Sequence, residues 1–169
     1  MTDGRLLLLE GGREMSFSYA DLMLYHGFSR PAGVAHAFKV MQLTLPLLSA
    51  DGCPLERREI GVRTAFNGAG ARDAFEMVTR ATSENRYLID PSLKRTARGQ
   101  FLARYVFMLS YRGKTVAAQI KSGHVRDEFI ALRGKSQLTD EEEDRVTFLR
   151  KEMATRLLAS PASEIYEVI

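Results

Sequence analysis

The sequence predicts an α+β fold in which a mostly antiparallel sheet packs against helices. Segments with helical periodicity come first, strand-like segments interrupted by one helix follow, and a long helix comes last. This segregation is typical of α+β proteins, and a two-residue turn between the two best strands favours antiparallel pairing. At 169 residues the chain can bury a proper core, so we expect a single domain over residues 1–169, with its core at about 17–168.

The first predicted helix covers residues 17–25. Ser18 can cap its N-terminus, with Asp21 three residues later, because such side chains accept hydrogen bonds from free backbone N–H groups. Gly27 can supply the left-handed residue that often follows a helix. We therefore expect a short helix that ends in a tight turn carrying His26 and Arg30.

A second helix is predicted from Pro31 to Pro46. Proline suits the first turn of a helix, whereas Pro46 is expected to end the helix or to follow its end closely. Four apolar residues at helical spacing predict one buried face, and we interpret His36, beside that face, as a partly buried structural histidine. The four apolar residues are Val34, Phe38, Met41 and Leu45.

The middle of the chain predicts a strand, a glycine-containing loop and a helix in that order. The strand is expected at Glu59–Phe66 and the helix at Asp73–Arg80, with Gly68 and Gly70 between them. This order suits anion binding, because the N-terminus of a helix exposes free N–H groups. The glycine spacing is not that of a dinucleotide-binding fingerprint or a P-loop, so no particular ligand is indicated.

The strongest predicted strand pair is Phe101–Tyr111 with Lys114–Lys121. Both segments are rich in aromatic and β-branched residues and are joined by a compact turn at Arg112-Gly113. A shorter strand is expected at Tyr87–Ile89. These segments supply the predicted sheet.

The last predicted helix has clear signals at both ends. Thr139 and Glu142 form a capping box, and acidic residues fill the first turn, where they suit the helix dipole. Pro161 ends the helix. The tail that follows, Ile165–Val168, is apolar enough to dock on another surface.

The net charge of +3 and the pI of about 9.1 make the chain mildly basic. Basic residues gather between Arg80 and Arg104, and acidic residues between Asp140 and Asp144. We interpret these regions as two solvated faces of opposite sign rather than as a nucleic-acid footprint, although a symmetric dimer could also pair them. Nucleic acid is therefore not expected as a partner.

The sequence shows neither an export signal nor a membrane span. The longest aliphatic run, Leu6–Leu9, is too short for either, so we expect no membrane partner and a cytoplasmic location. Cys53 is the only cysteine, which excludes an internal disulfide and a metal site built from several cysteines.

The turn between the first two helices carries a resemblance to a known family. Residues 26–33 read His-Gly-Phe-Ser-Arg-Pro-Ala-Gly, and Ala-Phe-Lys follows at 37–39. This order is similar to the His-Gly-His-x-Cys-Pro-Gly turn of the FmdE-like family, and to the pattern of a small, an aromatic and a basic residue that follows the turn. The family takes its name from a component of formylmethanofuran dehydrogenase. One extra residue stands between the proline and the glycine. The segments 70–74, 79–81, 112–113 and 160–168 are also similar, so the resemblance covers nearly the whole chain.

The resemblance implies an α+β fold with a metal site whose ligands this chain has lost. The family's other ligand positions hold Phe28, Arg30, Gly70 and Ala81 here, and only His26 keeps its type. One histidine cannot supply the three or four ligands of a zinc site, and the fixed positive charge of an arginine opposes a cation. We therefore expect no metal and no cofactor.

The residues that remain around this turn suit an anion. Histidine can act as an acid or a base near neutral pH, and the arginine fork binds carboxylate or phosphate at two points. The alternative is structural: Arg30 pairs with Asp73, and His26 caps a helix end or bonds a carbonyl group. The candidate ligand-binding residues are His26, Arg30, Asn67, Arg72, Asp73 and Thr79.

Two functions from different classes remain open. The first is a non-metal accessory or small-anion-binding protein, expected to be a homodimer because the apolar tail and the strong hairpin suit a self-complementary contact. The second, which the family name implies, is a small cytoplasmic enzyme acting on a one-carbon or pterin-like metabolite. No catalytic residue can be named from the sequence, and a resemblance in fold does not fix function.

Overall fold

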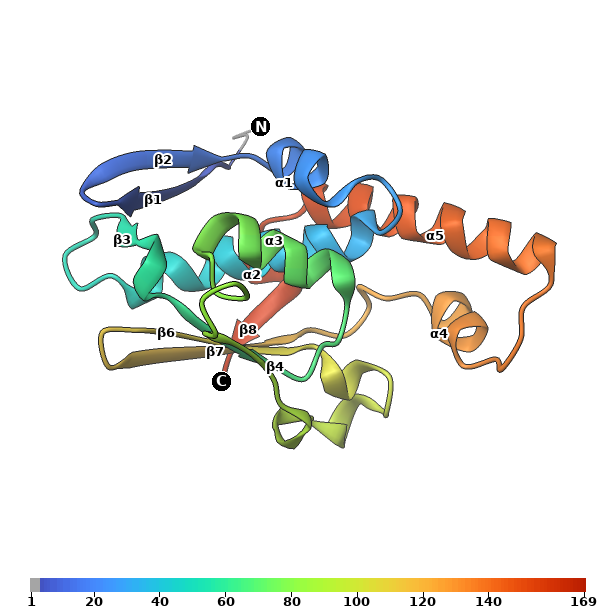
Figure 1. The fold of residues 1–169 in the computed structure, drawn as a ribbon. Coiled ribbons are helices and arrows are strands. Elements are labelled where there is room, and N and C mark those ends of the chain that lie inside the picture. Colours follow the sequence, from blue (N-terminus) through green and yellow to red (C-terminus); the bar gives the residue numbers. More distant parts are fainter. Residues whose placement is uncertain (1–3) are drawn as a thin grey trace.

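The computed structural model describes residues 4–169 and contains both helices and sheets, which confirms the α+β class. Figure 1 shows a layer of helices over one face of a five-stranded sheet, with a separate hairpin at one end. No helix within the described range has the length and the apolar character that a bilayer crossing requires. The helices are α1 (Tyr19–His26), α2 (Pro31–Leu48), α3 (Ala69–Thr79), α4 (Asp127–Arg133), α5 (Asp140–Ala159) and α6 (Ala162–Ile165).

The main sheet is mixed rather than purely antiparallel. Its strands are β4 (Gly61–Thr64), β5 (Tyr87–Ile89), β6 (Val106–Tyr111), β7 (Lys114–Ile120) and β8 (Tyr166–Val168). The strand order is β5-β4-β6-β7-β8, in which β4 and β5 run parallel and the other neighbours run antiparallel. The predicted hairpin at Arg112-Gly113 is present, but β6 begins later than expected because residues 102–104 form a 3₁₀ turn.

A small second sheet near the N-terminus was not expected from the sequence. It contains β1 (Leu6–Glu10), β2 (Arg13–Phe17) and β3 (Leu55–Glu56), in the order β2-β1-β3. Gly11 and Gly12 turn the chain with φ of 58° and 78°, a conformation that glycine adopts readily. Leu6 and Leu8 of this hairpin are 4% and 0% exposed. The buried core therefore starts before residue 17, where the sequence placed it.

Helix α2 is the centre of the helical layer. It packs against α1, α3, α5 and the strands β6 and β7, so most of its circumference is buried, as expected for a core helix. The prediction that Pro46 ends this helix is wrong, because α2 continues to Leu48. Pro46 lies exposed in the last turn, where its missing N–H group removes a single backbone hydrogen bond.

The ends of α1, α3 and α5 follow local sequence signals with one exception. The capping boxes at Ser18 and Thr139 are both present, and Gly27 ends α1 with φ of 87°. Helix α3 was expected to begin at Asp73 but begins at Ala69. Gly70, which the sequence predicted to lie in a loop, is therefore inside the first turn of α3.

The C-terminal tail packs within its own chain. Strand β8 pairs with β7, and Ile165 and Tyr166 are 0% and 1% exposed. These two side chains are therefore not free for a contact between copies of the chain, although Val168 remains 52% exposed. Helix α4, which the sequence did not predict, packs on α5.

Candidate anion-binding site

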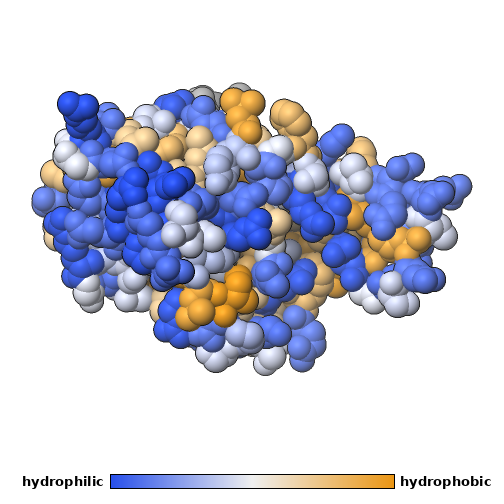
Figure 2. Space-filling model, in the orientation of Figure 1, coloured by the Kyte–Doolittle hydropathy of each residue, from blue (hydrophilic) through white to orange (hydrophobic). Residues whose placement is uncertain are grey.

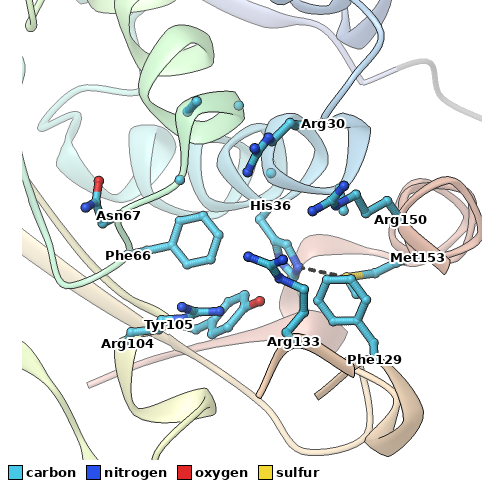
Figure 3. Close-up of a pocket in the computed structure, with 15 residues that line it drawn as sticks. Arg30, His36, Phe66, Asn67, Arg104, Tyr105, Phe129, Arg133, Arg150 and Met153 are labelled. Atoms are coloured by element: carbon cyan, nitrogen blue, oxygen red, sulfur yellow. Dashed lines mark hydrogen bonds between the residues drawn. The ribbon is translucent and has the colours of Figure 1, made fainter. Parts of the chain in front are cut away.

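The N-terminal ends of α2 and α3 meet at a hollow on the protein surface (Figure 3). Gly33 and Gly70 allow this approach: a Cβ atom on Gly70 would lie 2.7 Å from the carbonyl oxygen of Arg30, and one on Gly33 would lie 3.3 Å from the Ala71 nitrogen. Neither helix end has a side-chain cap. Two sets of free backbone N–H groups, each at the positive end of a helix dipole, therefore lie beside one hollow.

Four arginines from four separate elements line this space, which we call the inner hollow. Arg30 precedes α2, Arg104 ends the 3₁₀ turn before β6, Arg133 ends α4, and Arg150 lies on α5. Figure 3 shows the guanidinium groups of Arg30, Arg133 and Arg150 directed toward the same space. The hollow has room of about 100 Å³ for water-sized molecules, and its other named wall residues are His36, Phe66, Asn67, Tyr105, Phe129 and Met153.

No ion pair in the described chain balances the positive charge of the inner hollow, and Glu143 only partly offsets the repulsion at Arg150. Within residues 4–169, none of the four arginines forms an ion pair, and the lining of the hollow includes no Asp or Glu. The Nε atom of Arg104 is buried without a hydrogen-bond partner among the described residues. Arg30 and Arg133 are exposed and can be hydrated, whereas Arg104 and Arg150 are partly buried, so a bound anion would offer these two side chains partners that water supplies only in part.

Repulsion between the arginines is visible at Arg150. The pKa of its guanidinium lies below the ordinary value, first because burial removes water and then because Arg30 and Arg133 repel its charge. Arginine stays protonated in proteins, so this cost remains in the free protein. A bound anion would relieve it.

The floor of the inner hollow is neutral. His36 is 1% exposed, and burial lowers its pKa to about 3, with His124 and Arg156 adding smaller repulsions. The Tyr166 hydroxyl lies 2.8 Å from His36 Nδ1, and Met153 Sδ lies 3.4 Å from Nε2. Both ring nitrogens therefore have partners, and His36 is the buried structural histidine that the sequence predicted, more deeply buried than expected.

A second depression, which we call the outer hollow, adjoins the inner one. Its lining includes Arg30 and Asn67, which are shared with the inner hollow, and also Arg72, Tyr87 and Ile89. It has room of about 270 Å³ for water-sized molecules. Arg72 donates two hydrogen bonds to the Asp73 carboxylate, at 3.1 and 2.9 Å, so its charge is already balanced.

The six candidate residues from the sequence do not all lie at these hollows. Arg30 and Asn67 line both of them, and Arg72 lines the outer one. Asp73 bonds Arg72 and His26 instead of Arg30, so the structural alternative of an Arg30–Asp73 pair is not present. Thr79 is fully buried at the far end of α3, where its hydroxyl donates to the Phe75 carbonyl and accepts from the Ala81 N–H.

His26 is held by Asp73 rather than directed into either hollow. The distance between His26 Nδ1 and Asp73 Oδ2 is 2.8 Å. Burial raises the pKa of Asp73, but hydrogen bonds from His26 and Arg72 outweigh that effect and hold the pKa below its usual value. The carboxylate is thus ionised and accepts the Nδ1 proton, while Nε2 is buried without a partner in the described chain. Within residues 4–169, no group of three His, Cys, Asp or Glu side chains is placed to hold one metal ion.

The basic stretch from Arg80 to Arg104 does not form one cationic surface. Arg80 pairs with Glu76, Arg86 with Glu84 and Arg98 with Glu167. Arg104 turns toward the inner hollow, where its guanidinium lies 4.1 Å from the centre of the Phe101 ring. Much of this stretch is therefore neutralised locally.

Three of the four arginines at the inner hollow were missed by the sequence analysis. Arg104, Arg133 and Arg150 belong to segments that are far apart in the chain, and no local motif links them. For this part of the site, the glycines before and at the start of α3 were the only local signal in the sequence that indicated anion binding. Comparison with known proteins adds no assignment, because no protein-family model and no curated protein sequence matches this chain.

Proposed function

We propose that this protein is a non-catalytic, accessory protein that binds a small, multiply charged anion in the inner hollow. The observation that carries the proposal is the convergence of four arginines without ion pairs on two uncapped helix N-termini, within the described part of the chain. Guanidinium groups and helix N-termini both favour phosphate and carboxylate groups. The protein thus presents a preformed anion site.

Binding is favoured over catalysis by the residues around the anion. The histidine at the floor is neutral, and both of its ring nitrogens have partners. Burial raises the pKa of Tyr105, so that hydroxyl stays protonated. Neither group is suited to act as a general base near neutral pH. The alternative, an enzyme acting on a one-carbon or pterin-like metabolite, has only the family resemblance in its favour.

We further propose that the chain is a relative of the FmdE-like family that has exchanged a metal site for an anion site. Arg30 and Gly70 stand where the family has cysteines, and both lie at the inner hollow. Arg30 contributes a positive charge there, and Gly70, which has no side chain, contributes backbone at the N-terminal end of α3. We propose a cytoplasmic protein that binds a metabolite and carries no metal or other cofactor.

The proposed assembly is a homodimer. Leu24, Tyr25 and Phe28, on α1 and the turn after it, are 76%, 50% and 75% exposed. Figure 2 shows a surface that is largely hydrophilic, with small separate hydrophobic patches, and such a patch is a candidate for contact between copies. Light scattering should give twice the chain mass of 19.0 kDa for the wild type. A wild-type mass of 19.0 kDa, or an unchanged dimer in the Phe28→Ser variant, would count against this contact.

The anion site is tested by the Arg150→Gln variant in calorimetric titrations with inorganic phosphate. We expect wild-type binding and at least about a tenfold loss in the variant. A matched control is Arg13→Gln, which removes the same charge from the exposed hairpin between β1 and β2. The anion site would be rejected if phosphate and citrate failed to bind, or if both variants bound phosphate equally well.

Thermal unfolding without ligand adds a second readout. Removing Arg150 relieves its repulsion with Arg30 and Arg133, so the ligand-free variant should be at least as stable as the wild type. Phosphate at about 100 times the wild-type dissociation constant should stabilise the wild type and the control by roughly 2.7 kcal/mol, and the Arg150→Gln variant by no more than about 1.4 kcal/mol. Loss of binding with no loss of stability is typical of a binding residue rather than a structural one.

A further inference from the structure

The two hollows differ in charge although they share a wall. The inner hollow has four arginines and no carboxylate among its described lining. The outer hollow shares Arg30, while its second arginine, Arg72, is already paired with Asp73. One ligand that reaches both hollows would thus meet strong positive charge at one end and weaker positive charge at the other.

The two hollows meet at a shared edge. Asn67, Gly68 and Ala69 border both spaces. Gly68 has no side chain, and a Cβ atom there would lie 2.4 Å from the Phe66 ring. Because these residues border both spaces, a ligand seated at this edge can contact both hollows.

The inner hollow fits a phosphate better than a carboxylate. A phosphate monoester carries a charge of about −1.5 to −2 and three strongly accepting oxygens, whereas a carboxylate carries a single charge and two oxygens in one plane. Three guanidinium groups and two helix N-termini approach from several directions, and Arg104 lies at the wall. This three-dimensional set of donors matches a tetrahedral group. The available room of about 100 Å³ suits one such group rather than a chain of them.

The outer hollow fits an uncharged body that carries polar as well as apolar groups. Tyr87 and Ile89 come from β5, at the edge of the main sheet, and Asn67 adds an exposed amide. Burial raises the pKa of Tyr87 to about 12, so the tyrosine adds no charge. An aromatic or aliphatic group can lie against these side chains while its polar atoms meet the amide.

We propose, building on the anion-binding function above, that the natural ligand is a phosphate monoester of a small organic molecule. Its phosphate lies in the inner hollow at the N-termini of α2 and α3. Its uncharged body lies in the outer hollow against Tyr87 and Ile89.

Three probes test this assignment by calorimetric titration of the whole chain: inorganic phosphate, phenyl phosphate and benzoate. Phenyl phosphate should bind at least about tenfold more tightly than inorganic phosphate, because its ring enters the outer hollow. Benzoate should bind most weakly of the three. If benzoate bound as tightly as phenyl phosphate, the phosphate assignment would be overturned.

Two neighbouring variants locate the organic body. Ile89→Trp fills the outer hollow and should reduce the affinity for phenyl phosphate to that for inorganic phosphate, while inorganic phosphate still binds and reports an intact fold. Leu88→Trp is the matched control, because Leu88 is 53% exposed and does not line the hollow, and it should change neither affinity. The smaller change Ile89→Ala, which should lower only the phenyl phosphate affinity, covers the case in which Ile89→Trp does not fold.

The outcomes separate this inference from the function on which it rests. If inorganic phosphate binds and depends on Arg150 but phenyl phosphate gains nothing, or if the Ile89 variants keep the full gain, the monoester assignment is overturned and the anion site stands. If no anion binds at all, both proposals are overturned.

Discussion

Replacing Gly70 by alanine tests the close approach of α2 and α3 on which the site depends. A new Cβ atom would lie 2.7 Å from the carbonyl oxygen of Arg30 and 3.1 Å from the nitrogen of Val34. Both neighbours are backbone atoms, which cannot rotate away as a side chain could, so the two helix ends must separate. Such overpacking costs about 1–3 kcal/mol.

Helix propensity acts in the opposite direction. Alanine is favoured over glycine inside a helix by up to about 1 kcal/mol. The net effect of Gly70→Ala should therefore be a destabilisation of roughly 1–2 kcal/mol, or about 2–8 °C in melting temperature for a chain of this size. The same separation should weaken phosphate binding, because the N–H groups of the two helix ends no longer meet at one place.

The assay is urea unfolding followed by circular dichroism, with Gly134→Ala as the matched control. Gly134 follows α4 with φ of −82°, and a Cβ atom there would meet its nearest neighbours at an ordinary 3.5 Å. The control should change the unfolding free energy by less than about 0.5 kcal/mol. A Gly70→Ala protein as stable as the wild type, or more stable, would refute the argument that glycine is required by the close approach.

Three other substitutions test particular contacts. His36 has a pKa of about 3 when folded, below its ordinary 6.5. The unfolded state therefore binds more protons between these values, and the unfolding free energy should decrease as the pH is lowered, by up to about 1.4 kcal/mol per unit. His36→Gln should lose this slope between pH 6.5 and 5, and equal slopes for variant and wild type in urea titrations would contradict the prediction. Arg57 is 6% exposed, and its Nε donates a hydrogen bond to the Val78 carbonyl oxygen at 2.8 Å, at the end of α3. Arg57→Met should therefore lower the unfolding free energy by about 2–3 kcal/mol in the same assay. A loss under about 0.5 kcal/mol would show that water satisfies the carbonyl instead. The hydrogen bond from Arg126 is the largest cause that lowers the pKa of Glu152 to about 2, so the folded state gains stability above pH 4.5 that is lost as the pH falls toward 2. Glu152→Gln should cost about 1 kcal/mol at pH 7 and should flatten the curve of unfolding free energy against pH between 4.5 and 2. An unchanged curve would assign the acid dependence to other carboxylates.

Local signals in the sequence were reliable where the structure depends on neighbouring residues. The capping boxes at Ser18 and Thr139 and the turn at Arg112-Gly113 were predicted and are present. These features involve hydrogen bonds and dihedral angles within a few residues. The hairpin at Gly11-Gly12 has a similar local signal, since two glycines between short apolar runs are typical of a tight turn.

Predictions failed where packing decided the outcome. Helix α2 passes Pro46 because burial against its neighbours stabilises its last turn more than one missing hydrogen bond weakens it. Helix α3 includes Gly70 because a glycine is needed where another backbone comes within contact distance. A glycine in a sequence can indicate either a flexible backbone or a close approach of another backbone, and only the surrounding structure shows which applies.

The sequence by itself determined the α+β class, the ends of several helices and the idea of an anion site near Arg30 and the glycines before α3. The tertiary structure decided what completes that site, since Arg104, Arg133 and Arg150 join Arg30 from elements that are remote along the chain. The tertiary structure also placed His26 against Asp73, whereas Arg30 has no ion pair among the described residues. The physical reason is that hydrogen bonding within a helix or turn is a property of neighbouring residues, whereas a cluster of charges depends on which distant segments the folded core brings together.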